Sequence, residues 1–345
     1  MLRIGVIGVG AIGQGHVRRL HHLAPDLVKV TGVVDLSSDR VAALTREIPS
    51  LRAFESSNEL IDSPEIDAVV IASWGATHAD LAVRAISRGK PVFCEKPLAP
   101  TVADCQRIVE AELKADRRLV WVGFNRRYDK AYLELKQALD AHIVGKPLLI
   151  HCRHRNPGVP SHYTGDMPIT DTAVHEFDLV RWLFESEVSE VKVFLPPRSS
   201  RAKQNLVHDP VIIILKLSSG VVAEIEIFVN SYGYDISCEV VGEEGSLLLR
   251  ENPNLTTSKE GKVTGAIAQG YEERFAASYE LELRKWIESL LTGQHEGPTA
   301  WDGYMATLVA DYCLKSMQSD DMLTIKIPEC PKLYRKDFEL RGAAR

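Results

Sequence analysis

A lysine, an aspartate and a histidine have the residue types and spacing that general acid–base chemistry needs. Lys96 follows the apolar run 92–94 at the predicted carboxyl end of a strand, which is where open parallel sheets bind ligands. Asp171 and His175 lie four residues apart in a predicted helix, so their side chains share one face. A carboxylate beside an imidazole fixes its tautomer and stabilises its protonated form, which suits a base working near neutral pH. The plainer alternative is a helix N-cap beside an unrelated surface histidine.

The same residues could instead bind a metal ion. Together with His154, Asp171 and His175 would supply three zinc ligands. However, His175 begins the sequence His-Glu-Phe-Asp rather than an HExxH motif, and no cysteine stands at ligand spacing. We therefore expect no metal site.

A glycine-rich turn near the N-terminus has the pattern that binds a dinucleotide. The sequence GVGAIG at 8–13 follows a β-branched run at 3–7 and precedes a predicted helix. Gly8 permits a tight turn, Gly10 lets the backbone approach a pyrophosphate at the helix N-terminus, and Gly13 allows close packing of helix and strand. Because strand, glycines and helix occur together, the pattern is far more specific than the glycines alone. A glycine turn that binds no ligand is the alternative.

Asp35 predicts which coenzyme the turn accepts. It ends the predicted strand 28–34, at the distance of roughly 20 residues from Gly13 that the dinucleotide motif requires. A carboxylate there accepts hydrogen bonds from ribose hydroxyls and would repel a 2′-phosphate. No arginine occurs at 36–39, and Arg40 comes only afterwards. We therefore expect NAD rather than NADP.

Strands and helices alternate up to residue 123, which predicts an α/β Rossmann domain with a doubly wound parallel sheet over 1–123. The segment 73–78 closes one of these strands at the same sheet edge as Gly10, so it should line the dinucleotide, although His78 is more typical of a helix start than of a catalyst. The residues that we expect to bind the coenzyme are Gly8, Gly10, Ala11, Ile12, Gly13, Asp35, Ser73, Trp74, His78, Glu95 and Lys96.

After residue 123 the pattern changes to two helices and then mainly strands. Such a run predicts a C-terminal α+β domain over 124–345, with an open and mainly antiparallel sheet. One of its helices is expected at 171–184 and one of its strands at 211–217. Residues 211–215 are apolar on both faces of that strand, so a second subunit should cover the face that the domain's own helices leave open. We therefore expect a homo-oligomer.

Composition sets further bounds. The net charge of −6 and the pI near 6.0 give no basic face for nucleic acid. The six cysteines show neither metal-binding nor redox spacing, and no signal segment is recognisable, so we expect free thiols and a cytoplasmic location. No apolar run reaches the roughly 18 residues that span a bilayer, which predicts no membrane partner.

Several longer motifs make the chain similar to the glucose-fructose oxidoreductase / inositol dehydrogenase / MocA (Gfo/Idh/MocA) family. In order they are GVIGVGAIG, SWGATH, VFCEKPL, the triplet Arg126-Arg127-Tyr128, HRNP, DTAVHEFD and GPTAWDGY. The resemblance covers the chain from Leu2 to about Tyr304, with these motifs in order. The resemblance implies a Rossmann domain followed by an α/β domain whose open sheet serves oligomerisation, usually as a homotetramer.

The resemblance also implies a reaction, the NAD-dependent oxidation of a cyclic polyol, with myo-inositol converted at its axial C2 hydroxyl to 2-keto-myo-inositol. His175 would be the base, Asp171 would hold it, and Lys96 would stabilise the negative charge that develops on the same oxygen. Two further matches have plain alternatives, since Asp178 could be an ordinary helix residue and Tyr234 a strand aromatic. The substrate-binding residues that the resemblance implies are Lys96, Arg126, His154, Asn156, Asp171, His175, Asp178 and Tyr234.

Some positions depart from the family pattern and leave the substrate open. Asn125 stands where a methionine is familiar, and the loop within 156–168 also differs at 162–165. One added hydrogen-bond donor can change which stereoisomer is preferred. The alternatives are scyllo- or D-chiro-inositol, an aldopyranose, or a non-catalytic regulator that senses a sugar or NAD. The presence of Lys96, Asp171 and His175 together favours an enzyme.

Overall fold

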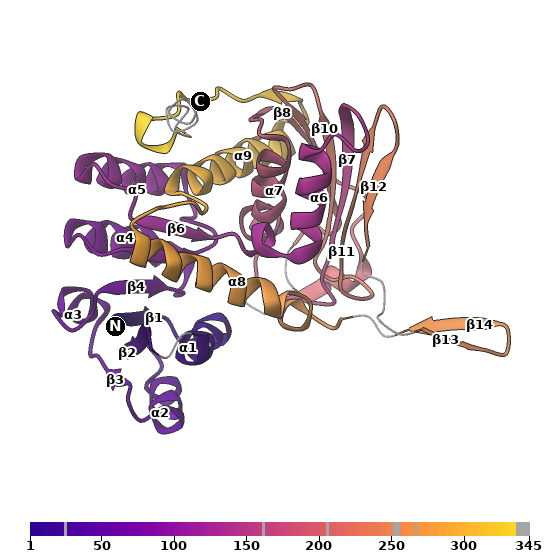
Figure 1. The fold of residues 1–345 in the computed structure, drawn as a ribbon. Helices are drawn as coiled ribbons and strands as arrows, with labels where there is room; N and C mark the ends of the chain where they lie inside the picture. Colours follow the sequence, from indigo (N-terminus) through magenta and orange to yellow (C-terminus); the bar gives the residue numbers. More distant parts are fainter. Residues whose placement is uncertain (24–25, 161–162, 205–206, 251–255, 266–267, 336–345) are drawn as a thin grey trace. The chain divides into compact units, whose positions relative to one another are not determined.

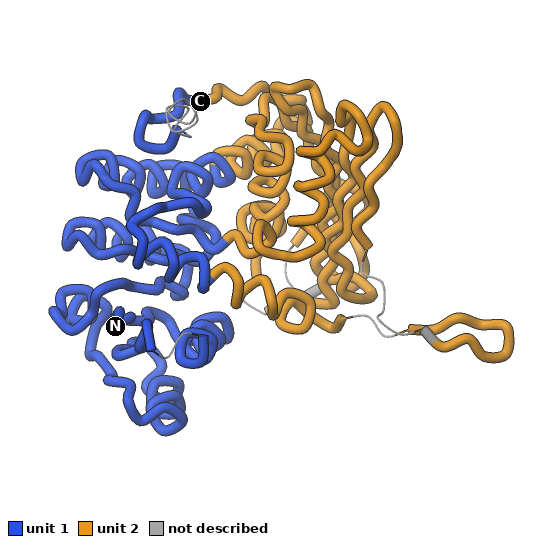
Figure 2. Tube along the Cα trace, in the orientation of Figure 1, with its two compact units in different colours: residues 1–123, 283–307, 328–345 blue, residues 124–282, 308–327 orange. Residues whose placement is uncertain are grey.

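The computed structural model describes residues 1–345 except 24–25, 161–162, 205–206, 251–255, 266–267 and 336–345 (Figure 1). Its chain forms two compact units (Figure 2). Unit 1 comprises 1–123, 283–307 and 328–345, and unit 2 comprises 124–282 and 308–327. The chain thus crosses from unit 1 to unit 2 after Gly123 and returns to unit 1 twice.

The two returning segments differ from the sequence analysis, which placed everything after residue 123 in one domain. They join unit 1 because its core is incomplete without them. Trp286 packs edge-on against Phe93, with ring centroids 5.5 Å apart and both side chains buried. The backbone amide of Val122 donates to the carbonyl of Pro298 at 2.9 Å. These are long-range contacts, which local periodicity does not reveal.

Unit 1 is built on a six-stranded sheet in the order β3-β2-β1-β4-β5-β6, and all its neighbouring strands are parallel. β4, β5 and β6 are buried along their whole length, which requires cover on both faces and explains why their sequences are apolar except for Glu95 at the end of β5. This is the predicted doubly wound architecture. The strands are β1 (Leu2–Ile7), β2 (Val28–Val34), β3 (Arg52–Ala53), β4 (Ala68–Ile71), β5 (Val92–Glu95) and β6 (Val120–Gly123).

Three helices of unit 1 begin where a side chain satisfies one of their first amides. Ser37, Ser56 and Thr101 each accept a hydrogen bond from the backbone amide three residues on, at the starts of α2, α3 and α5. The helix that follows the glycine turn is α1, and α4 begins at His78, in agreement with the prediction for that residue. Their bounds are α1 (Ala11–Leu23), α2 (Ser38–Glu47), α3 (Ser57–Asp62), α4 (His78–Ser87) and α5 (Val102–Ala115).

Unit 2 contains a seven-stranded sheet in the order β12-β11-β7-β10-β9-β8-β15. Only β7 and β10 pair in parallel, so the sheet is mainly antiparallel, as predicted. The helices α6 (Lys130–Asp140) and α7 (Val174–Phe184) lie on one face of it (Figure 1). The strands are β7 (Pro147–Arg155), β8 (Val188–Phe194), β9 (Val211–Leu217), β10 (Val222–Phe228), β11 (Asp235–Gly242), β12 (Ser246–Leu249) and β15 (Leu323–Thr324).

The remaining elements are two long helices, short helical turns and a small hairpin. The long helices each contribute to both units, because the units divide within them at residues 282–283 and 307–308. These elements are α8 (Tyr271–Thr292), α9 (Ala300–Ser319), η1 (Gly75–Thr77), η2 (Asn125–Tyr128), η3 (Pro168–Thr172), η4 (Ser200–Gln204), η5 (Lys332–Tyr334), β13 (Thr256–Lys259) and β14 (Lys262–Gly265).

The two faces of β9 differ in burial, which is relevant to the prediction that a second subunit covers one of them. Val211, Ile213 and Leu215 are buried, whereas Ile212 and Ile214 on the opposite face are only half-buried. The rest of that opposite face is not purely apolar, since Lys216 pairs with Glu190 at 2.9 Å. It is a mixed apolar and charged surface.

Candidate active site

The glycine turn of unit 1 has a shape that only glycine permits at two positions. Gly8 has φ of +84°, and a Cβ added there would lie 2.5 Å from the backbone of Ser73. A Cβ on Gly13 would lie 1.9 Å from the carbonyl oxygen of Gly8, so helix α1 and strand β1 could not approach as closely. At Gly10, by contrast, nothing lies within 4 Å of that position. The turn is therefore closed on its inner side and open where the helix begins.

Asp35 directly follows β2 and lies at the same edge of the sheet as the glycine turn. Its carboxylate accepts the amide of Val9 at 2.7 Å and that of Ser37 at 2.8 Å. Arg40 Nη1 lies 3.8 Å from Asp35 Oδ1, and its side chain is more than half exposed. The open space at Gly10, the amides of the helix N-terminus and this carboxylate fit a dinucleotide, whose phosphates would occupy the turn and whose ribose would approach Asp35.

The segment after β4 contains two hydroxyl groups within hydrogen-bond distance of each other and an exposed tryptophan ring. Ser73 Oγ and Thr77 Oγ1 lie 2.7 Å apart, and Trp74 is 74% exposed. His78 is buried instead, with Nδ1 2.9 Å from the carbonyl oxygen of Pro97 and Nε2 3.0 Å from that of Ser73. Burial lowers the pKa of His78. Its side chain thus links the ends of β4 and β5.

Lys96 directly follows β5, at the carboxyl end of the parallel sheet, as expected from the sequence. The side chain of Glu95, one residue earlier, is turned into unit 1. Its Oε1 lies 2.7 Å from Nε2 of the buried His16, and its Oε2 accepts the backbone amide of Lys96 at 3.1 Å. The sequence analysis did not single out His16, although its position three residues after Gly13, the last glycine of the GVGAIG motif, was visible there.

Asp171 and His175 lie in unit 2, in the segment that leads into α7. The prediction of one helix from Asp171 is wrong at its start, because residues 168–172 form a π-helical turn and α7 begins only at Val174. The amide of Ala173 donates to the carbonyl of Pro168 at 3.0 Å, which is the five-residue step of a π turn. Such turns are rare and recur at functional sites. Asp171 and His175 are both half-buried.

A buried polar cluster lies beneath His175. Arg126 and Glu176 form an ion pair, and Nδ1 of His154 lies 3.0 Å from both Arg126 Nη2 and Glu176 Oε1. Burial acts to raise the pKa of Glu176, but the charges of Arg126 and His154 outweigh it and lower that pKa to about 2. The rings of His154 and His175 have centroids 6.2 Å apart. The structure therefore brings three predicted residues together with Glu176, which the sequence analysis missed.

Two more of the predicted substrate residues have partners inside unit 2. Asp178 is buried and accepts a hydrogen bond from Arg127 Nε at 2.8 Å. Asn156 is tied through its backbone, whose amide donates to Phe228 and whose carbonyl accepts from Ser231 at 2.8 Å. Tyr234 is buried just before β11.

Asn125 was considered a possible determinant of the substrate. The structure gives it an internal partner, because it is buried and its Nδ2 donates to Ser278 Oγ at 3.2 Å. Residues 161–162 of the departing loop lie outside the described residues. Tyr163 of the same loop is buried, and its hydroxyl lies 2.5 Å from Thr172 Oγ1 in the π turn.

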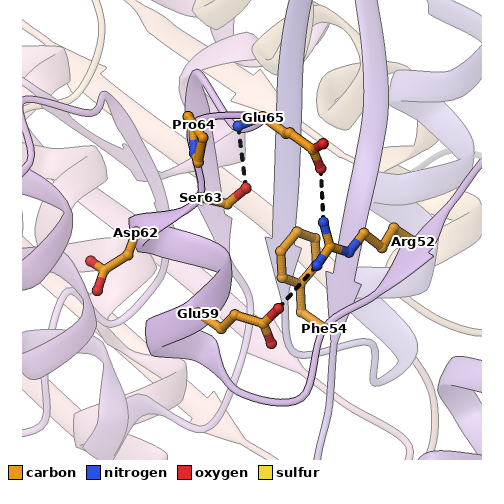
Figure 3. Close-up of a pocket in the computed structure, with 7 residues that line it drawn as sticks. All are labelled: Arg52, Phe54, Glu59, Asp62, Ser63, Pro64 and Glu65. Carbon is orange, nitrogen blue, oxygen red and sulfur yellow. Dashed lines mark hydrogen bonds and ion pairs between the residues drawn. The ribbon is translucent and has the colours of Figure 1, made fainter.

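A surface hollow elsewhere on unit 1 has no comparable chemistry. Figure 3 shows Arg52 held between two carboxylates, with Glu65 at 2.9 Å and Glu59 at 3.1 Å. Its guanidinium also lies over the ring of Phe54. The charges of Arg52, Glu59 and Glu65 in this hollow are therefore engaged with one another.

The described part of the chain contains neither a metal-binding cluster nor a membrane-spanning helix. Within the ranges given above, no three histidine, cysteine, aspartate or glutamate side chains gather into a group that could hold a metal ion. Among those same residues, no helix combines the length and the apolar character that a bilayer crossing demands.

Comparison with known proteins places this geometry in context. Residues 2–124 match the family model of an oxidoreductase family with an NAD-binding Rossmann fold, and residues 136–327 match that family's C-terminal alpha/beta domain. The chain is 43% identical over 334 residues to inositol 2-dehydrogenase 3 of Saccharopolyspora erythraea, covering 96% of this chain and 98% of the relative.

Two further similarities concern a second bacterial enzyme and a solved structure. The chain is 43% identical over 341 residues to the inositol 2-dehydrogenase/D-chiro-inositol 3-dehydrogenase of Shouchella clausii, covering 97% of each chain. It superimposes with a TM-score of 0.92 on the crystal structure of myo-inositol dehydrogenase from Lactobacillus casei in complex with NAD(H) and myo-inositol. That structure is 32% identical and covers 97% of this chain and 100% of its own.

Proposed function

Because the chain belongs to the Gfo/Idh/MocA family of NAD-dependent oxidoreductases, we propose that it oxidises myo-inositol at its axial C2 hydroxyl to 2-keto-myo-inositol. The observation that carries the proposal is similarity over the whole chain. A relative that is 43% identical over 96% of the chain has the name inositol 2-dehydrogenase 3, and a solved structure with a TM-score of 0.92 contains NAD(H) and myo-inositol.

The proposed chemistry divides between three side chains. His175 removes the proton of the reacting hydroxyl, and Asp171 orients the imidazole and stabilises its charged form. Lys96 donates a hydrogen bond to the same oxygen and stabilises the negative charge that develops there, an effect of about 3 to 4 kcal/mol for one well-placed donor. The glycine turn and Asp35 would hold NAD, which would supply the acceptor for the hydride that leaves the carbon.

The buried cluster around Glu176 suggests how the base is supported. Arg126 and Glu176 carry opposite charges in a buried region, and His154 lies within hydrogen-bond distance of both, so their mutual contacts are strong and hold each side chain in one place. Since the ring of His154 lies beside that of His175, we infer that this cluster sets the orientation of the base. Arg126 and His154 then act on the substrate mainly through His175, while Asn156, Asp178 and Tyr234 stay proposed contacts of the polyol.

One alternative substrate has a specific observation in its favour. The Shouchella clausii relative is named for a second activity on D-chiro-inositol, at a similar level of identity. We therefore include D-chiro-inositol, oxidised at C3, as the second candidate.

We also propose that the protein assembles as a homotetramer through the sheet of unit 2. The half-buried Ile212 and Ile214 support this, because apolar side chains on an otherwise solvated sheet face gain stability when a second sheet covers them. The ion pairs on the same face would then lie in or around the contact.

The test of the function is NADH formation by the purified protein with a panel of inositol isomers and aldopyranoses. We expect the highest kcat/KM with myo-inositol, and the replacements Lys96→Ala and His175→Ala to lower kcat by at least about 100-fold while NAD still binds. The matched controls Lys114→Ala and His22→Ala change exposed residues and should leave kcat intact. No NADH with any polyol, or wild-type turnover in either active-site variant, would contradict the proposal.

A further inference from the structure

We propose that His16 is a positioning residue for Lys96, acting through its buried contact with the carboxylate of Glu95. The inference rests on the catalytic role proposed for Lys96. All the contacts that carry it lie within unit 1.

The Glu95 carboxylate connects helix α1 to the backbone of Lys96. Its Oε1 lies 2.7 Å from His16 Nε2, and its Oε2 accepts the backbone amide of Lys96 at 3.1 Å. His16 comes from the second turn of α1, whereas Glu95 is the last residue of β5. The carboxylate therefore joins a helix to the first residue after a strand.

The surroundings leave this carboxylate little freedom. His16 is fully buried and its ring packs edge-on against Phe93, with centroids 5.4 Å apart. A Cβ on Gly123, at the end of β6, would lie 3.1 Å from Glu95 Oε2, so the glycine leaves the space that the carboxylate occupies. Hydrogen bonds in such a site are strengthened by the low dielectric, and the loss of a partner is costly for the same reason.

The other side of Lys96 is held as well. Nδ1 of the buried His78 lies 2.9 Å from the carbonyl oxygen of Pro97, which is the next residue. The backbone is thus held by Glu95 before Lys96 and by His78 after it. With its main chain fixed in this way, the lysine side chain starts from one defined point.

A fixed starting point matters because a displacement of about 1 Å at a catalytic group can cost about 100-fold in rate. His16 also belongs to helix α1, whose N-terminus faces the coenzyme site. Its loss could therefore impair the enzyme through NAD binding instead of through Lys96, and the experiment must distinguish these two effects. If His16 served only to hold α1 for the coenzyme, its loss would weaken NAD binding and leave kcat unchanged. If it positions Lys96, kcat must fall.

The first experiment compares His16→Ala with His16→Gln in the full chain. We expect His16→Ala to lower kcat about tenfold or more, while the Kd for NAD, measured by fluorescence titration, changes less than about threefold. Glutamine keeps an N–H donor that can reach Glu95, so His16→Gln should recover most of the lost kcat. The control His22→Ala removes an exposed histidine from the same helix and should match the wild type.

The second experiment repeats His16→Ala in a Lys96→Ala background. A residue that acts only through Lys96 has nothing left to position there, so the added substitution should change the residual kcat less than about twofold. A repeated tenfold loss in that background would overturn the inference. So would a wild-type kcat in His16→Ala, or a loss confined to NAD affinity.

Three outcomes must be distinguished: a misfolded variant, a wrong catalytic role for Lys96 and a wrong positioning role for His16. Circular dichroism and Tm check that each variant is folded. Should His16→Ala not fold, Glu95→Gln keeps the shape but removes the charge, and an unchanged kcat in that variant would overturn the proposal. If Lys96→Ala keeps full turnover, the catalytic role proposed for Lys96 is wrong. If Lys96→Ala loses turnover but His16→Ala does not, only the positioning role of His16 is refuted.

Discussion

Asp35 contacts two backbone amides at short distance and one arginine at longer distance. The amides of Val9 and Ser37 lie within 2.8 Å of its oxygens, whereas Arg40 stands 3.8 Å away. The carboxylate therefore both shapes the turn and partly neutralises a nearby cation. Removing it would leave the positive charge of Arg40 available to an anionic group, such as the 2′-phosphate that distinguishes NADP.

We predict that Asp35→Ser lowers the preference for NAD over NADP by about tenfold or more, which corresponds to about 1.4 kcal/mol. Steady-state kcat/KM for each coenzyme measures the ratio. The control Asp39→Ser removes an exposed carboxylate four residues away and should leave the ratio unchanged. A ratio that does not move in Asp35→Ser would show that this carboxylate does not select the coenzyme.

At the scale of single residues, the sequence analysis identified the glycines, Asp35 and Lys96 from strong local patterns. It could not identify Glu176 or His16 as parts of buried pairs. Their partners lie far away in sequence, so no spacing rule connects Glu176 with Arg126, or His16 with Glu95. Asn125 illustrates the reverse case, because a residue at which the sequence departs from the family pattern has a buried partner in Ser278.

At the scale of elements, α5 is joined to two neighbours by one buried carboxyl group. Glu112 accepts the backbone amide of Val120 at 2.7 Å, at the start of β6, and the hydroxyl of Tyr334 at 2.7 Å, from the chain's last described turn. Burial is the main cause that raises the pKa of Glu112 to about 7, against the hydrogen bonds, which lower it.

This carboxyl group makes stability depend on pH. Its pKa is higher in the folded chain, so the folded state binds more protons than the unfolded state between about pH 4.5 and 7, and stability falls as the pH rises through that window. We predict that Glu112→Gln, which cannot titrate, loses this dependence. The free energy of unfolding of this variant, relative to that of the wild type, should rise by roughly 3 kcal/mol between pH 5 and pH 8.

Chemical unfolding at the two pH values measures that gain. The exposed Glu110 of the same helix provides the control Glu110→Gln, whose stability should follow that of the wild type at both. An equal pH response in Glu112→Gln and the wild type would refute the assignment.

Elements were predicted well where the period of apolar residues is clear. The strands predicted at 28–34 and 211–217 appear in the structure as β2 (Val28–Val34) and β9 (Val211–Leu217). The π turn before α7 was not predicted, because an extra residue in a helical turn leaves the apolar pattern almost unchanged. Its position depends on tertiary contacts such as that of Tyr163 with Thr172.

At the scale of the whole molecule, the proposed tetramer predicts how one substitution changes the assembly. Ile214→Glu places a charge on the half-buried face of β9 that a second sheet would cover. Burying an unpaired charge is too costly for an interface of ordinary size to tolerate. We expect light scattering at micromolar concentration to give a homotetramer for the wild type and smaller species for Ile214→Glu.

The matched control for that experiment is Leu113→Glu, which changes an exposed apolar residue on α5 of unit 1. It should leave the measured mass as in the wild type. A monomeric wild type, or a tetramer that survives Ile214→Glu, would contradict assembly through this face.

The return of residues 283–307 to unit 1 has a consequence for biosynthesis. The ring of Trp286 covers Phe93, and Pro298 supplies an acceptor at β6, so the coenzyme-binding unit lacks part of its core until these residues have left the ribosome. By then unit 2 has been synthesised almost completely. The coenzyme unit is therefore not a module that can be cut out at Gly123 and exchanged between proteins; a functional transplant would have to carry the later segments with it.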